Sequence, residues 1–108
     1  MALELESADL DGDCVIKAVG EVDLYSSPRL REVILKSIPA VQRAVGVDLS
    51  QVAYMDSSGV ATLVEGLKAS GKSDKAFVLL SPSPSVMKVL QLSRLDAVFT
   101  IKEALSSL

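Results

Sequence analysis

A carboxylate and two hydroxyls stand directly before a glycine at Asp56, Ser57, Ser58 and Gly59. Serine hydroxyls in such a segment can cap a helix, attack a substrate as nucleophiles or accept a phosphoryl group. From Ser57 onward, apolar residues recur three and four positions apart, which predicts a helix that begins at this segment. All three roles remain open on this evidence, because serine at a helix start suits each of them.

Two residue types that often serve in catalysis and metal binding are scarce in this chain, which has no histidine and one cysteine, Cys14. Histidine is the usual base for a catalytic serine, and structural zinc takes four Cys or His ligands. A Ser-His-Asp hydrolase is therefore excluded, and we expect neither a metal site nor a cofactor. A nucleophilic Ser57 would need a lysine partner, for which Lys68 and Lys72 are the nearest candidates in the sequence. We expect a protein that is not an enzyme and has no catalytic residues.

The length and net charge of the chain limit the number of domains and the kinds of partner that we expect. The chain has 108 residues, of which 49% are hydrophobic and 23% charged, and its net charge is −3. This length predicts one compact domain over residues 1–108, and the acidic balance argues against nucleic-acid binding, which needs clustered Lys and Arg. No secretion signal and no membrane-length apolar run is visible. We therefore expect a cytoplasmic protein that does not insert directly into a membrane.

Alternating and helical patterns predict the elements that position the Ser57 segment. The expected strands are 3–9, 14–22, 44–49, 75–80 and 97–101, and the expected helices begin at Pro28, Ser57, Pro84 and Lys102. Ser27 and Ser83 are the expected N-caps, because each precedes a proline at the first helical position. This order predicts a single α/β domain with a mixed sheet of about five strands, parallel in its interior, and amphipathic helices packed against it.

Three segments resemble the STAS family, and in particular its stand-alone anti-sigma factor antagonists. They are GEVDLYSSPRL at 20–30, VDLSQVAYMDSSGVATL at 47–63 and LLSPSPSVMKVLQLSRLDAVFTIKEAL at 79–105. The Asp-Ser-Ser-Gly junction after the lead-in L-S-x-V-x-Y-M is the specific part. The resemblance covers nearly the whole chain and implies a single STAS domain over residues 1–108.

The resemblance implies a protein-binding module that phosphorylation switches. In the family, the first hydroxyl after the Asp is phosphorylated, which corresponds to Ser57. The unphosphorylated domain would bind an anti-sigma factor that is also a GHKL-type serine kinase, which frees a sigma factor to regulate transcription; a phosphatase would restore binding. Unpaired N–H groups at a helix start should make a phosphate tolerable to the domain itself. A weak homodimer is also left open.

By resemblance, Asp23, Asp56, Ser58 and Gly59 are expected at the partner-binding surface. Each has a simpler structural interpretation. Asp23 would ordinarily be a loop acid that holds little of the core, and Asp56 a turn or capping acid. Ser58 should point into the first helical turn as a cap, and Gly59 could relax a crowded turn.

Two features of the chain depart from the family pattern. The helix after Ser58 reads GVATLVEGL rather than the expected glycine-leucine run, and Ser93 and Arg94 stand where a glycine often closes the third helix. Gly66, which costs about 1 kcal/mol relative to Ala inside a helix, indicates close packing or docking. Because the altered helix leaves the identity of the partner open, the alternative function is a STAS subunit of a lipid-transporting ABC system. Such a subunit would bind a transporter component without phosphorylation.

Overall fold

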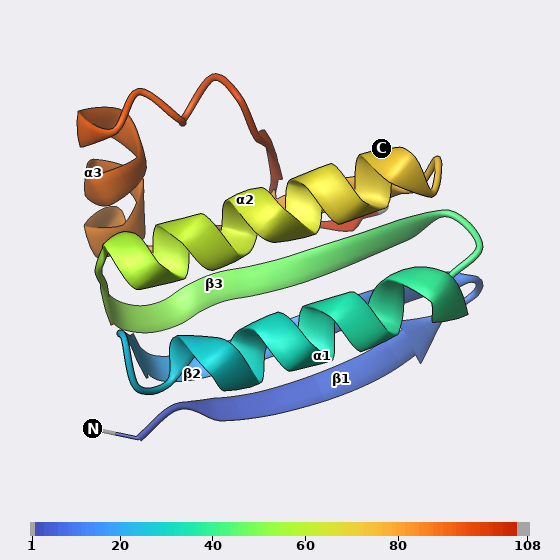
Figure 1. The fold of residues 1–108 in the computed structure, drawn as a ribbon, viewed down its shortest axis with the longest axis horizontal. Coiled ribbons are helices and arrows are strands. Elements are labelled where there is room, and N and C mark those ends of the chain that lie inside the picture. Colours follow the sequence, from blue (N-terminus) through green and yellow to red (C-terminus); the bar gives the residue numbers. More distant parts are fainter. Residues whose placement is uncertain (1, 106–108) are drawn as a thin grey trace.

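The computed structural model describes residues 2–105 and has the mixed-sheet α/β fold that the sequence predicts (Figure 1). The strands are β1 (Glu4–Leu10), β2 (Asp13–Val22), β3 (Ala44–Met55), β4 (Ala76–Leu80) and β5 (Thr100–Lys102), and the helices are α1 (Ser27–Ala40), α2 (Ser57–Lys72) and α3 (Pro84–Leu92). The prediction of a helix from Lys102 is wrong at its start, because this residue ends β5; residues 106–108 of that prediction lie outside the described residues.

The five strands form one sheet in the order β1-β2-β3-β4-β5. Only β1 and β2 pair in antiparallel fashion, and the remaining neighbours are parallel. Parallel neighbours need a crossover, and each of the three helices supplies one. In Figure 1 the first turns of α1 and α2, together with α3, lie at one end of the sheet, at the left. We call this end, where β2 and β3 finish, the carboxyl edge.

Helices α1 and α2 pack side by side over one face of the sheet (Figure 1). Their inward residues include Leu30, Ile34 and Leu63, all at most 1% exposed, as the helical spacing predicted. The fully buried side chains of α3 in the same core are Val86 and Leu90, and Met87 and Val89 pack against it. Burial of these positions fixes which face of each helix meets the sheet, and therefore which residues stand at its exposed start. No helix within residues 2–105 is long and apolar enough to cross a membrane.

The pairing of β2 with β3 contains two register shifts, between Lys17 and Val19 and between Gly20 and Glu21. Gly20 has a φ of +122°, and a Cβ there would lie 2.2 Å from the carbonyl oxygen of Ala2, so only glycine fits. Pairing continues to the end of both strands. Strand β3 therefore runs to residue 55 rather than ending at residue 49 as predicted.

Candidate functional site

The carboxyl edge brings together two acids that are far apart in the sequence. Val22 and Met55 form the last parallel pair of β2 and β3. Asp23 directly follows β2, and Asp56 directly follows β3. The backbone N–H of Asp56 donates to the Val22 carbonyl at 3.1 Å. The loop that leads to α1 and the start of α2 therefore leave the sheet as neighbours.

Helix α2 is capped by Asp56, not by either serine. The Oδ1 atom of Asp56 accepts hydrogen bonds from the backbone N–H groups of Ser58 at 2.9 Å and of Gly59 at 3.4 Å. A side chain at the N-cap reaches the second and third helical N–H groups, and this carboxylate occupies both. The prediction that Ser58 acts as the cap is therefore wrong. Ser57 is the exposed hydroxyl at the first helical position, and Ser58 is half-buried.

This cap also alters the expected environment of a phosphate at Ser57. The N–H groups of Ser58 and Gly59, expected from the sequence to be unpaired, are held by Asp56. A phosphate on Ser57 would add to the carboxylate charge already present at this helix start. That expectation is therefore wrong for these two donors.

Gly59 is buried between the ends of both strands. A Cβ at this position would lie 2.5 Å from Cγ of Met55 and 2.8 Å from Cγ1 of Val22. Such distances are far shorter than van der Waals contact, so a side chain here would force Met55, Val22 or the first turn of α2 to shift. Packing accounts for this glycine, and a partner contact at Gly59 stays a prediction.

Asp23 organises the loop between β2 and α1. Its Oδ1 atom accepts hydrogen bonds from the N–H groups of Tyr25 and Ser26, both at 2.9 Å, and lies 3.1 Å from the Ser26 hydroxyl. The Ser26 N–H, followed by the Ser26 hydroxyl and the Tyr25 N–H, holds the pKa of the Asp23 carboxyl below its usual value. Asp23 therefore has a structural role in this loop, because its carboxylate holds the backbone of Tyr25 and Ser26 in place.

The same loop corrects the predicted cap of α1. Its N-cap is Ser26, and Ser27 is already the first helical residue. The Ser26 hydroxyl makes no capping bond to the helix, because it lies 2.9 Å from the Glu21 carbonyl and accepts the Asp23 N–H at 3.0 Å. Local sequence could not reveal this, since the cap is set by contacts to the end of β2.

Comparison with known proteins identifies the fold. A family model described as STAS domain matches residues 4–108. The chain belongs to the STAS domain family. This STAS domain is 31% identical over 103 residues to the anti-sigma-B factor antagonist of Staphylococcus aureus (strain NCTC 8325 / PS 47), and the match covers 95% of both chains.

Solved structures agree with this assignment. An anti-sigma factor antagonist from Mycobacterium paratuberculosis aligns with the STAS domain at a TM-score of 0.86 and 25% identity, over 98% of this chain and 90% of that one. The anti-sigma factor antagonist SpoIIAA in its unphosphorylated form aligns at 0.78 and 26% identity, over 98% and 91%. The Bacillus SpoIIAA in its phosphorylated form aligns at 0.73 and 25% identity, over 98% and 95%.

Neither lysine considered as a partner for a nucleophilic Ser57 lies near it in the STAS domain. Lys68 and Lys72 follow it on the same helix, roughly 16 and 22 Å away along the axis at about 1.5 Å per residue. A Ser–Lys pair requires hydrogen-bond contact, so this arrangement is excluded.

Gly66 is likewise explained by packing. A Cβ there would lie 2.7 Å from the ring of Phe77 on β4 and 3.0 Å from Ile34 on α1. Of the two interpretations of this glycine, close packing is therefore confirmed, and Gly66 faces the core rather than the surface.

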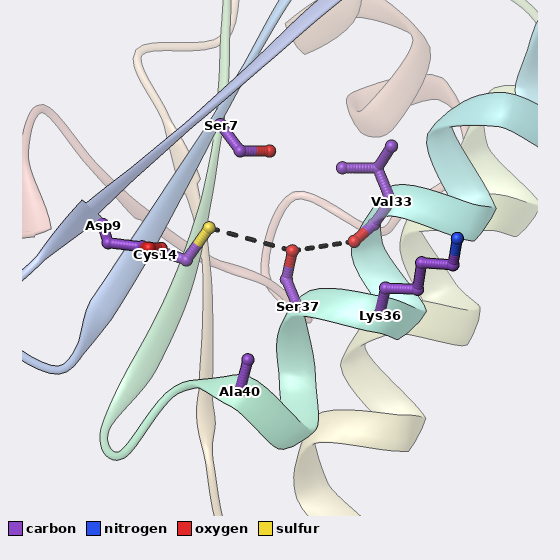
Figure 2. Close-up of a pocket in the computed structure, with 7 residues that line it drawn as sticks. All are labelled: Ser7, Asp9, Cys14, Val33, Lys36, Ser37 and Ala40. Atoms are coloured by element: carbon purple, nitrogen blue, oxygen red, sulfur yellow. Dashed lines mark hydrogen bonds between the residues drawn. The ribbon is translucent and has the colours of Figure 1, made fainter.

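A cavity of about 270 Å³ lies between β1 and α1 of the STAS domain, away from the carboxyl edge. Cys14 faces Ser37 in this cavity (Figure 2). The Cys14 Sγ lies 3.8 Å from the Ser37 Oγ, and the Ser37 hydroxyl donates to the Val33 carbonyl at 2.8 Å. Cys14 stands near the start of β2, eight residues from Val22, or roughly 26 Å at about 3.3 Å per residue. The cavity therefore does not belong to the surface around Ser57.

Two apolar residues that no sequence pattern singled out are exposed at the carboxyl edge. Leu24 and Tyr25 follow Asp23 directly, and they are 65% and 89% exposed. No periodic pattern marks loop residues as buried or exposed, so only the fold reveals them.

Proposed function

We propose that this STAS domain is an anti-sigma factor antagonist, a binding module rather than an enzyme, whose carboxyl edge docks an anti-sigma factor and thereby frees a sigma factor. The observation that carries the proposal is an exposed Ser57 at the first position of α2, beside the neighbouring acids Asp23 and Asp56. The full-length similarity to an anti-sigma-B factor antagonist supports this role. The proposed contact residues are Asp23, Asp56, Ser58 and Gly59.

Phosphorylation of Ser57 is the proposed switch. The phosphate would bring about −1.5 to −2 charges to a helix start whose second and third N–H groups are already held by Asp56. The new charge would therefore remain at the surface, near carboxylates, instead of being neutralised by its own domain. Because the cap of α2 stays in place, the fold survives and the complex with the partner weakens. The good alignment with SpoIIAA in its phosphorylated form supports a fold that persists after modification.

The partner has to supply the transfer chemistry. The chain has no sequence motif for a nucleotide-cradling loop, so the proposed kinase is the anti-sigma factor itself, of the GHKL type, with ATP as donor. The Ser57 oxygen attacks the γ-phosphorus, the bond to the ADP oxygen breaks, and the hydroxyl proton passes to a base of the kinase. A phosphatase then hydrolyses the serine phosphate with water and returns the binding form.

The phosphorylation site is tested by incubating the protein with ATP and each GHKL-type anti-sigma factor of the organism that carries this gene. Mass spectrometry should place one phosphate on Ser57. Ser58→Ala should still carry the phosphate on Ser57, and Ser57→Ala should not be modified. Full modification of Ser57→Ala, with the phosphate on Ser58, would contradict the assignment.

Binding is tested by calorimetry with the same purified anti-sigma factors. Ser57→Asp should weaken binding, though less than phosphate does, because a carboxylate carries less charge. Ser73→Asp is the matched control, since residue 73 is an exposed serine at the opposite end of α2. Equal affinity of Ser57→Asp and wild type would overturn the electrostatic account. Binding to a lipid-transporter component that ignores Ser57→Asp would instead favour the ABC-system alternative.

A further inference from the structure

Leu24 and Tyr25 form a consecutive pair of large exposed side chains in the loop between β2 and α1. A single exposed apolar residue is common on protein surfaces and needs no explanation. This pair differs because it lies at the carboxyl edge, directly after Asp23 and beside the start of α2. We call Leu24 and Tyr25 the apolar pair.

The backbone that carries the apolar pair is held at several points. The Asp23 carboxylate accepts the N–H groups of Tyr25 and Ser26, and the Asp23 carbonyl accepts the N–H of Ser27 at 2.8 Å. The Ser26 side chain ties the same turn to the end of β2 through the Glu21 carbonyl. An exposed aromatic ring on a fixed backbone loses little conformational entropy when it binds, which is the property of an interface anchor.

We propose that the apolar pair is the anchor of the anti-sigma factor interface and that Asp23 is the positioning residue that holds it in place. The inference rests on the proposed function, because the occupant is the partner that docks at Ser57. The apolar pair is continuous with the proposed docking surface around Ser57. The last strand pair, Val22 with Met55, sets the loop of the apolar pair and the start of α2 side by side. The partner is expected to present an apolar pocket edged by cationic side chains.

The surroundings of the pair fit this role. Energetic anchors in interfaces are enriched in Tyr and are ringed by polar groups that exclude water once the complex forms. Here the Asp23 carboxylate, which accepts the Tyr25 N–H, supplies such a polar border, and Asp56 follows the end of the neighbouring strand. A phosphate on Ser57 would join this border and retain water there, so the switch would act by preventing desolvation of the anchor.

The anchor is tested by titrating the purified anti-sigma factors with wild type, Leu24→Ser and Tyr25→Ser. Loss of the tyrosine should weaken binding by about 30-fold or more, and loss of the leucine by about 10-fold. Leu10→Ser is the matched control, because Leu10 is 54% exposed at the turn between β1 and β2, away from the carboxyl edge. It should bind within about 2-fold of wild type, and thermal melts should show all three variants folded.

The positioning role of Asp23 is tested with two variants. Asp23→Asn keeps an amide oxygen that can accept the N–H groups of Tyr25 and Ser26, whereas Asp23→Ala removes the acceptor. Hydrogen exchange of these two amides in the unbound protein should be as slow in Asp23→Asn as in wild type and faster in Asp23→Ala. Binding should weaken more in Asp23→Ala, which loses both the charge and the acceptor, than in Asp23→Asn, which loses the charge alone. If Asp23→Asn loses affinity as fully as Asp23→Ala while its amides stay protected, the carboxylate acts by charge and the positioning role is wrong.

The outcomes separate this inference from the proposed function. Normal binding by Tyr25→Ser, together with weakened binding by Ser57→Asp, overturns the anchor and leaves the antagonist function intact. Failure of wild type to bind any anti-sigma factor overturns both. If sedimentation shows a wild-type dimer that Tyr25→Ser converts to a monomer, with partner binding unchanged, a second copy of the chain covers the pair and the anchor is again overturned.

Discussion

The backbone N–H of Asp56 donates to the carbonyl of Val22 at 3.1 Å, one residue beyond the last parallel strand pair. This bond joins the start of α2 to the end of β2, and so fixes the loop of Asp23 relative to Ser57. The candidate site is thus assembled by strand ends rather than by one contiguous segment. Its local stability can be tested separately from its function.

Removal of the Asp56 side chain should destabilise the domain more than removal of the Ser57 hydroxyl. Asp56→Ala loses the cap of α2 and should cost about 0.5 to 2 kcal/mol of unfolding free energy. Ser57→Ala, at an exposed position that makes no cap, should change it by less than about 0.5 kcal/mol. Urea unfolding measures both, with Asp56→Asn as a control that keeps the capping oxygen. The reverse order would show that a serine caps the helix.

Two glycines of α2 should respond to alanine with opposite sign. Gly66→Ala gains about 1 kcal/mol of helix propensity but forces a methyl against the buried ring of Phe77, an overlap that costs about 1 to 3 kcal/mol. Gly71→Ala meets nothing within 4 Å and should stabilise by about 0.5 to 1 kcal/mol. Thermal and urea unfolding of both variants provide the comparison. Stabilisation by Gly66→Ala would mean that the core has room beside Phe77.

Arg94 occupies the position where a glycine usually ends a helix. Its φ is +58°, and the N–H groups of Arg94 and Leu95 close α3 by bonding to the carbonyls of Gln91 and Leu90. Arg94→Gly should relieve the left-handed backbone strain and raise the unfolding free energy by about 0.5 to 1 kcal/mol. Arg94→Ala keeps that strain, so it should bring no gain. Equal stabilisation by both variants would point to the lost charge instead.

The ion pair of Asp13 with Arg43 should make stability fall in acid. Arg43 donates from Nε and Nη2 to the two oxygens of the buried Asp13, and these bonds lower the pKa of its carboxyl although burial opposes them. A carboxyl with a lowered folded pKa contributes stability above its unfolded pKa of about 3.9, and this is lost as pH falls through the folded pKa. Arg43→Gln should therefore be less stable than wild type near pH 7, and the difference should shrink below about pH 4. Urea unfolding across this range tests it, and a constant difference would rule out this linkage.

The sequence alone determined the elements whose signals are local. Prolines at the first turn predicted α1 and α3, and apolar residues three and four positions apart predicted all three helices. This spacing places the apolar residues on one face of a helix, which packs against the core. The same patterns, with the family resemblance, were enough to select the mixed sheet and to single out the segment at Ser57.

Tertiary structure decided what depends on contacts between distant segments. The choice of Asp56 over Ser58 as the cap of α2 follows from the orientation of the chain as it leaves β3. The need for glycine at position 66 follows from Phe77 on β4, which no pattern within α2 could reveal. The placement of the loop of Asp23 and Tyr25 next to the start of α2 follows from the pairing of β2 with β3. Register and packing arise between segments far apart in the chain, and a local pattern carries no record of which segment lies opposite.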